Sequence, residues 1–270
     1  LLVGHFNNES SLIDGGLRVS STAFDIQQAG TQVLLSEPES NLVATIDAAN
    51  NRIGSSVTLP AGVTTDLGGK NVSILDQGGK LWATTFSSVA SFSAEVFDPV
   101  GEFGQGAVAV TGTDGLVHVA SAKKSKVYSY SLAGDGTVAQ TAEHDLDGVT
   151  AATDLKITAV GSRVVVLDAT KNRVLIPGGS DVDVPAESRL QQESEASDNV
   201  VVATPTDLLR IPLGGGEPVS IPSEGGNGGA AAPVFVAGCA YGAWSDGARI
   251  VRDCPDTKND KFEELKARAL

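Results

Sequence analysis

Short apolar strands separated by tight turns recur along the whole chain. In each unit one apolar or alternating run leads into a turn that contains Gly or Asp, and a second apolar run follows. The turn markers are Gly30, Gly79, Gly115, Gly161, Asp198 and Gly238. Successive markers lie 49, 36, 46, 37 and 40 residues apart. A repeat of about 40–50 residues is the length of a four-stranded propeller blade.

The composition of these runs favours strands over helices. They are rich in Val, Ile, Leu and Thr, as in Leu155–Val160 and Arg163–Leu167, which is typical of β-structure. Capped helical periodicity is missing except at residues 261–270, a charged tail that is either helical or frayed. We therefore predict an all-β fold, with residues 1–270 forming a single β-propeller domain. It has six recognisable blades, or seven if the two chain ends share one and Leu1–Phe6 closes the ring.

A second turn recurs within the blades. Asp168–Val174 aligns with Ser121–Val127, and a similar segment at Asp47–Ile53 is expected one turn later in its own blade. Two further stretches read as connections. The polar, acidic residues Ala186–Asn199 indicate an edge or loop, and the glycine-rich residues Gly225–Ala232 indicate a flexible loop between blades.

The two cysteines, Cys239 and Cys254, flank a hairpin signal. Asp246-Gly247 is a strong two-residue turn, and a turn there pairs residues whose numbers sum to 493, which places the cysteines opposite each other. Counted from the turn, this is a hydrogen-bonded pair, whose Cα atoms stand farther apart. We predict a disulfide and hence an oxidising compartment, with two buried free thiols as the alternative.

The charge balance excludes several classes of partner. The formal net charge is −14, whereas nucleic-acid binders and proteins that dock on anionic membranes carry basic surfaces. No apolar run approaches the roughly 18–20 residues of a membrane span. Methionine is absent and the chain begins Leu1-Leu2-Val3, so we expect a processed piece of something longer whose anchor lies outside this chain.

Three segments resemble the N-terminal β-propeller region of large actinobacterial surface proteins. They are Leu208–Pro218, Gly238–Trp244 with Val251–Cys254 after it, and the early strand Val3–Asn7. In that family a membrane segment precedes the propeller, and immunoglobulin-like or fibronectin type III repeats follow it. The resemblance implies an extracellular or cell-surface location and a structural role, because the family offers no settled biochemical activity to carry over.

No catalytic motif appears in the sequence. G-x-S-x-G, H-E-x-x-H, the Walker loop, G-x-G-x-x-G and C-x-x-C are all absent, and Asp145–Gly148 lacks the later acids of a calcium loop. The three histidines are His5, His118 and His144. We interpret His118 as a hydrogen-bonded strand residue, His144 as solvated and His5 as structural. We therefore expect no catalytic residues, no metal and no cofactor.

The acids and tryptophans carry two further alternatives. Asp76, Asp114, Asp135 and Asp168 read as solvated turn residues, and the alternative is an acidic funnel for a cation or cationic ligand. Trp82 and Trp244 read as inner-strand residues that pack sheet on sheet, and the alternative is a carbohydrate platform.

The sequence thus favours a non-catalytic extracellular scaffold or binding propeller. Its partner is an unknown protein or glycan, with no nucleic acid and no direct membrane contact from this segment. The runner-up is a propeller hydrolase or lyase acting on a small molecule or glycan. Convergence of histidines and acids in the central channel would discriminate the two, because propeller enzymes assemble their sites from several blades.

Overall fold

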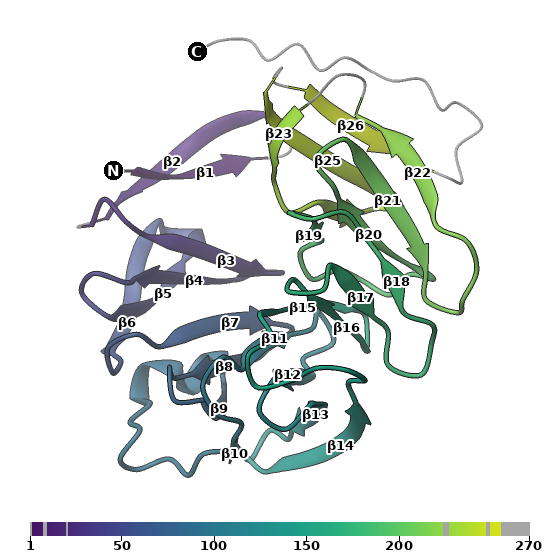
Figure 1. The fold of residues 1–270 in the computed structure, drawn as a ribbon. Helices are drawn as coiled ribbons and strands as arrows, with labels where there is room; N and C mark the ends of the chain where they lie inside the picture. Colours follow the sequence, from purple (N-terminus) through teal and green to yellow (C-terminus); the bar gives the residue numbers. More distant parts are fainter. Residues whose placement is uncertain (1, 8–9, 20, 224–226, 247–248, 255–270) are drawn as a thin grey trace.

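The protein is an all-β propeller, as the sequence predicts. A computed structural model describes residues 2–7, 10–19, 21–223, 227–246 and 249–254. Antiparallel sheets follow one another around a ring and stack face to face, with their first strands toward the centre (Figure 1). Successive hairpins build each sheet, so the chain passes from the centre to the rim and then returns to the centre for the next sheet.

Six sheets hold four labelled strands each, and we number them as blades 1–6. Blade 1 has β3 (Asp25–Ala29), β4 (Gln32–Glu37), β5 (Leu42–Asp47) and β6 (Arg52–Thr58), with the short 3₁₀ helix η1 (Ala48–Asn50) between the last two. Blade 2 has β7 (Thr64–Gly68), β8 (Asn71–Leu75), β9 (Lys80–Thr85) and β10 (Gly101–Glu102), with η2 (Phe86–Ser91) after β9.

The next three blades repeat this order. Blade 3 has β11 (Val108–Thr111), β12 (Val117–Ser121), β13 (Lys126–Leu132) and β14 (Val138–Asp145). Blade 4 has β15 (Leu155–Val160), β16 (Arg163–Asp168), β17 (Arg173–Leu175) and β18 (Val182–Asp183). Blade 5 has β19 (Arg189–Leu190), β20 (Asn199–Ala203), β21 (Asp207–Pro212) and β22 (Val219–Pro222).

Blade 6 is built differently. Its strands are β23 (Asn227–Ala230), β24 (Val234–Val236), β25 (Cys239–Asp246) and β26 (Arg249–Asp253). Both β23 and β24 pair with the same edge of β25, and Ala231 N–H donates to Ala243 O between them. They are therefore one interrupted inner strand, and part of the expected Gly225–Ala232 loop is strand instead. Gly225 and Gly226 lie outside the described residues.

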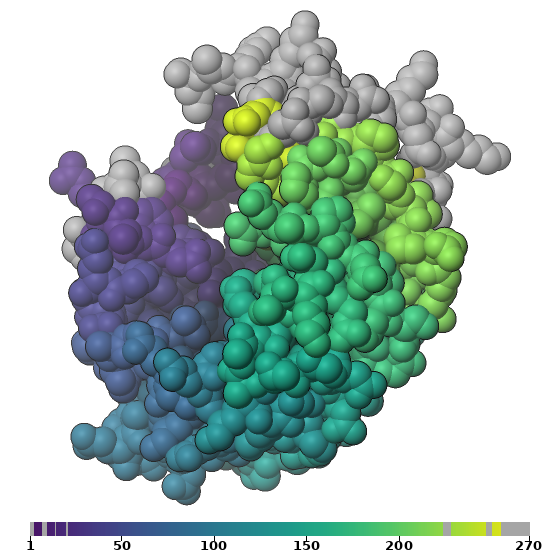
Figure 2. Space-filling view, in the orientation of Figure 1, coloured from purple at the N-terminus to yellow at the C-terminus, as the bar shows by residue number. Residues whose placement is uncertain are grey.

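The N-terminal chain adds a two-stranded sheet to the ring. β1 (Leu2–Asn7) pairs with β2 (Leu12–Arg18), and this hairpin lies between blade 1 and blade 6 (Figure 1). β1 therefore stands where the sequence places Leu1–Phe6, but among the described residues its sheet has no strand from the C-terminal end, so the blade expected to be shared by the two chain ends is not seen. Leu1 and the C-terminal residues 255–270, including the expected tail, lie outside the described residues. In the space-filling view an opening remains beside the purple N-terminal strands (Figure 2).

One marker of the sequence repeat is out of phase. Gly30, Gly115, Gly161, Asp198 and Gly238 all lie between the first and second strands of their blades, but Gly79 lies between β8 and β9. The matching turn of blade 2 contains Gly69, which has a φ of +55°. The sequence pattern selected Gly79 because the turn between β8 and β9 also contains glycine and is also flanked by two apolar strands. The Asp47–Ile53 segment does lie one turn later in its blade, between β5 and β6, as expected.

The hydrophobic core consists of separate layers between neighbouring blades. Phe103, fully buried after β10, packs with Leu75 and Leu81 of blade 2 and with Tyr128 and Tyr130 of blade 3. A larger layer between blades 4 and 5 has eleven buried apolar side chains. Blades 1–5 therefore have an apolar layer on both faces, which explains why fully apolar runs recur along the chain.

The predicted disulfide between Cys239 and Cys254 is present in the structure. The β25–β26 register pairs Ala240 with Asp253 and Trp244 with Arg249, so paired numbers sum to 493 as expected. Gly247 of the expected turn lies outside the described residues. The Cα atoms of the cysteines are 4.3 Å apart, closer than in a hydrogen-bonded pair, because β26 ends at Asp253 and the cysteines close the hairpin beyond its last ladder pair.

Removing the disulfide should destabilise the protein by about 2 kcal/mol. A 15-residue loop corresponds to about 3 kcal/mol of chain entropy, and the paired strands lower this because they already hold the ends together. Urea unfolding of the Cys239→Ala/Cys254→Ala variant checks the value. The wild type should lose the same amount in reductant and the variant should not respond. A wild type insensitive to reductant, with reduced thiols verified by labelling, would contradict the prediction.

Candidate functional site

An aspartate from blade 2 occupies the contact between the first strands of blades 2 and 3. Asp66 lies in β7, and its carboxylate accepts a hydrogen bond from the backbone N–H of Thr111 in β11. The Thr111 hydroxyl donates to the backbone O of Asp66 at 3.0 Å, and its oxygen lies 3.0 Å from Ser73 Oγ. This network fixes one carboxylate between the innermost strands of two neighbouring blades.

Burial first, and then the negative charges of Glu193 and Asp25, raise the pKa of Asp66, while the hydrogen bonds from Thr111 lower it; the resulting pKa is about 7. Glu193 comes from blade 5 and Asp25 from blade 1, so carboxylates of two other blades act on Asp66. Mutual repulsion of this kind favours a proton or another positive charge between them.

Asp66→Asn should stabilise the protein at pH 8 by about 2 kcal/mol, a value reduced from the full shift because the side chain is only partly buried. The unfolded aspartate titrates near 3.9. Between that value and about 7 the folded state holds a proton that the unfolded state has lost, so this contribution to stability declines as pH rises. The gain should shrink toward pH 5 in urea unfolding, and an equal gain at both pH values would contradict the assignment.

A loop from blade 5 crosses one end of the channel. Residues 191–198, the crossing loop, join β19 to β20 and touch three other blades. Ser194 N–H donates to Ala159 O and Gly161 N–H donates to Ser194 O in blade 4, while Thr113 Oγ1 in blade 3 donates to Ser194 O at 3.1 Å. Gln192 N–H donates to Pro233 O in blade 6. These bonds hold the acids of the loop in fixed places.

The side chain of Gln191 anchors this loop from within. It is 3% exposed, its Oε1 accepts from Val201 N–H at 2.6 Å, and its Nε2 donates to Ser194 Oγ at 2.7 Å. A buried amide whose donors and acceptor are used in this way specifies one loop conformation. The expected Ala186–Asn199 connection is therefore an ordered element of the site.

An open groove of about 790 Å³ lies where the crossing loop meets blade 6. We call it the acidic groove. Glu193, Glu195 and Asp198 of the crossing loop line it. The exposed apolar residues Val219, Val234 and Val236, which are 44%, 38% and 55% exposed, line it as well. Arg210 also lines the groove, but its Nη1 lies 2.8 Å from Asp253 Oδ2, so its charge is already paired. The groove is thus acidic and apolar.

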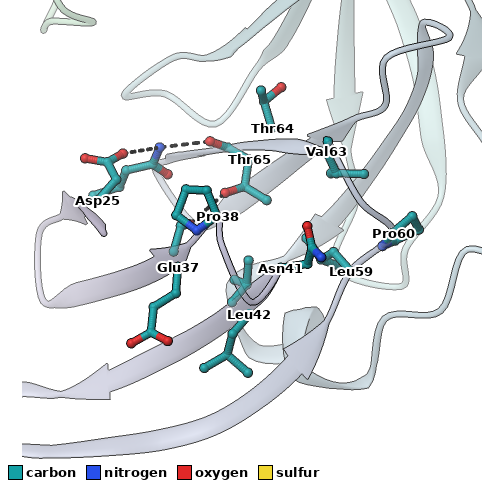
Figure 3. A pocket seen from close by; sticks show the side chains of 14 residues that line it. Asp25, Glu37, Pro38, Asn41, Leu42, Leu59, Pro60, Val63, Thr64 and Thr65 are labelled. Atoms are coloured by element: carbon teal, nitrogen blue, oxygen red, sulfur yellow. Dashed lines mark hydrogen bonds between the residues drawn. The ribbon is translucent and has the colours of Figure 1, made fainter. Parts of the chain in front are cut away.

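A second hollow, of about 300 Å³, opens on the opposite face (Figure 3). Connections between the second and third strands and between blades emerge there, because adjacent antiparallel strands turn at alternate ends. In this view Asp25 and Glu37 lie to the left and Leu59 and Pro60 to the right, with Leu42 between them (Figure 3). Ser36 Oγ and Thr65 Oγ1 are 3.0 Å apart in its wall.

The histidines do not converge on the channel. His118 is fully buried in β12, and its Nδ1 lies 2.7 Å from Ser129 Oγ, so it is a hydrogen-bonded strand residue as interpreted. His144 and His5 are exposed in β14 and β1. The hydrogen-bonded Ser–His pair was not expected from the sequence, because the two residues meet only through the β12–β13 register.

The protonation of the His118–Ser129 pair follows from burial. Desolvation lowers the pKa of His118 to about 4, although Asp114 opposes it, so the ring is neutral near pH 7. Its Nε2 is buried without a hydrogen-bond partner among the described residues. A buried N–H without an acceptor costs more than a bare lone pair, so we assign the proton to Nδ1, which donates to Ser129 Oγ. A donating histidine does not activate a serine nucleophile.

Three of the four predicted turn acids are accessible and act as expected. Asp76, Asp114 and Asp135 each accept a backbone N–H of their own turn. Asp168 differs, because it is fully buried and accepts from Thr170 and Lys171 N–H. Residues that follow blade 3 contact this turn through Lys171 and Arg173. Asp168 was predicted to be solvated, but it is buried and caps the end of β16.

The tryptophans pack between sheets, but they do not stand on the innermost strands. Trp82 lies in β9 and Trp244 in β25, the third strand of blade 2 and the second of blade 6. Both are buried, and their Nε1 atoms donate to Phe97 O at 3.0 Å and Thr204 O at 2.8 Å. Their rings are committed to the inter-blade layers, so the carbohydrate platform is excluded at these positions.

Among the described residues, no group of three or more His, Cys, Asp or Glu side chains is arranged to hold a metal ion. Asp147 and Gly148, from the calcium-like fragment, instead offer backbone oxygens to Arg173 and Lys171 of blade 4. In the same described part of the chain, no helix is long and apolar enough to cross a membrane.

No protein-family model matches the sequence, and no curated protein matches it. Solved propellers are similar in fold. The Cps50 (Swd1) β-propeller domain of Myceliophteria thermophila has a TM-score of 0.58 and 10% identity, over 92% of this chain and 88% of that one. Virginiamycin B lyase from Staphylococcus aureus, a catalytically inactive variant with quinupristin, has a TM-score of 0.56 and 14% identity, over 92% and 86%.

A third similar structure is Atg21 in complex with the coiled coil of Atg16. Its TM-score is 0.61 and its identity 9%, over 82% of this chain and 76% of that one. At such identities the similarity shows the fold alone. A propeller in complex with a protein partner and a lyase both occur among these structures, so the fold does not distinguish binding proteins from enzymes.

Proposed function

We propose that the protein is a non-catalytic binding propeller whose acidic groove receives a basic, partly apolar segment of a protein partner. The observation that carries the proposal is the composition of the groove, which is lined by Glu193, Glu195 and Asp198 together with the exposed side chains of Val234 and Val236. Exposed apolar side chains rimmed by charge of one sign are typical of protein-interaction sites. The net charge of −14 would also accelerate the approach of a basic partner.

Two observations support a binding role over the hydrolase or lyase alternative. The hydrogen-bonded Ser–His pair has its histidine donating, so no base activates Ser129. The channel acid Asp66 is held by Thr111 and lies beside further carboxylates, with no histidine among the groups that shift its pKa. We propose in addition an extracellular location in a larger surface protein, supported by the disulfide and by the sequence resemblance.

A labelled eight-residue peptide of alternating lysine and valine tests the groove by fluorescence anisotropy. Saturable binding is expected, and Glu193→Gln/Glu195→Gln should weaken it about tenfold, since two charge pairs contribute about 0.7 kcal/mol each. The matched control Glu95→Gln/Glu102→Gln removes the same charge from blade 2 and should leave affinity within twofold.

Two further peptides separate charge from apolar contact. Alternating glutamate and valine should not bind, and alternating lysine and serine should bind more weakly than lysine and valine. Higher salt should weaken the interaction because exposed charges are screened. Equal weakening by the groove variant and the blade 2 control would show attraction to the overall charge and would overturn the groove as the site.

A further inference from the structure

A separate cavity of about 380 Å³ lies between β13 and β14 of blade 3 and the turns that follow β15, β17 and β21 in blades 4 and 5. Unlike the acidic groove, it has no Asp or Glu among the described residues that line it. Its polar lining residues are Ser129, His144, Ser162 and Arg163. Val164, Ile176 and Leu213, all at least nine-tenths buried, form its apolar part together with Ala142.

The buried histidine sets the direction of the Ser129 hydroxyl. Because His118 Nδ1 donates to Ser129 Oγ, the serine oxygen is used as an acceptor and its proton must point elsewhere. Ser129 is 6% exposed and lines the cavity, so the cavity is the direction open to that proton. His118 thereby turns Ser129 into a fixed donor, which a solvated serine would not be.

The acids next to His144 do not share this cavity. In β14 the side chains alternate, so Glu143 and Asp145 lie on the opposite face of the sheet from His144. There both carboxylates pair with Lys126, whose Nζ is 3.2 Å from Asp145 Oδ1 and also contacts Glu143 Oε1. Among the described residues that line the cavity, Arg163 therefore supplies the charge. That charge is positive, whereas the net charge of the protein is −14.

We propose that this cavity is a binding site for a small carboxylate with a short aliphatic body. Arg163 would supply the charge and the forked donor geometry that carboxylates prefer, and Ser129 would supply a preoriented hydroxyl. The aliphatic body would lie against Val164, Ile176 and Leu213. The site is independent of the acidic groove, which takes a ligand of the opposite charge.

Butanoate is the probe, measured by saturation-transfer NMR on the full chain. We expect a dissociation constant on the order of 1 mM, which is usual for so small a ligand. Butan-1-amine and butan-1-ol share the aliphatic body and should bind at least tenfold more weakly. Equal binding of the amine or the alcohol would overturn the proposal, as would no saturable binding of butanoate.

Arg163→Gln should weaken butanoate binding about tenfold, because it removes the charge from an exposed side chain that the fold does not need. Arg18→Gln, the same substitution at an exposed position in β2, is the matched control and should change affinity less than twofold. An equal loss in both variants would overturn the site.

Ser129→Ala should weaken binding about fivefold. This variant also leaves His118 Nδ1 without its acceptor, so its melting temperature is measured alongside. If it does not fold, His144→Gln replaces it, with an expected loss of about threefold from the removal of one exposed donor. Unchanged affinity in the folded variant would contradict the role given to that donor.

Discussion

Replacing Phe103 by alanine is expected to destabilise the protein by about 4 kcal/mol. The side chain is 1% exposed and fills the layer between blades 2 and 3. Its ring centroid lies 5.2 Å from that of Tyr128 and 6.2 Å from that of Tyr130, and Lys124 Nζ stands 4.7 Å from the ring. The two tyrosines belong to β13, a paired strand that cannot collapse into the space, so most of the cavity would remain.

Urea unfolding at fixed pH measures this loss. Phe103→Leu keeps most of the volume and should cost about 1.5 kcal/mol. Val96→Ala, at a position that is 78% exposed, should stay within about 0.5 kcal/mol of the wild type. A loss below about 1.5 kcal/mol for Phe103→Ala would contradict the view that each inter-blade layer is a packed core.

Gly68→Ala should cost about 3 kcal/mol, because the added methyl group meets the backbone of the next blade. A Cβ at this position would lie 2.1 Å from Thr111 O and 2.3 Å from Gly112 O. Both are backbone atoms, so relief requires the first strands of blades 2 and 3 to separate. That separation would also weaken the hydrogen bonds that Thr111 makes to Asp66.

Gly134→Ala is the matched control, since a Cβ there meets nothing within 4 Å. The same substitution should therefore change stability by less than about 0.5 kcal/mol. Thermal unfolding of both variants, followed by circular dichroism, separates close approach from the general effect of losing a glycine. Equal effects in the two variants would contradict the close approach at Gly68.

The blades were predictable because each is a local unit. Strand, turn and strand alternate within about 40 residues, and the pairing of β25 with β26 follows from one turn and a constant sum of residue numbers. The error at Gly79 has the same origin. Blade 2 has two turns that contain glycine and stand between apolar strands. Nothing in the local sequence shows which of them joins the first and second strands of the blade.

The channel and the groove were not predictable in detail, because their residues come from different blades. Asp66 meets Thr111 and Glu193 only after the ring has closed. The acidic stretch Ala186–Asn199 was recognisable from its composition, but its passage across the channel depends on Ser194 bonding to blade 4. Gln191 stands a few residues before the apolar strand β20, and this is the only hint of it in the sequence. Its burial results from contacts formed in the folded protein.

Hydrogen–deuterium exchange in the presence of the lysine–valine peptide tests the binding role most directly. We expect slower exchange of the amides of residues 193–199 and 234–238, which line the acidic groove. The hollow on the opposite face, at residues 59–65, should be unaffected. Protection of residues 59–65 with no change at 193–199 would contradict the account, as would uniform protection over the whole acidic surface.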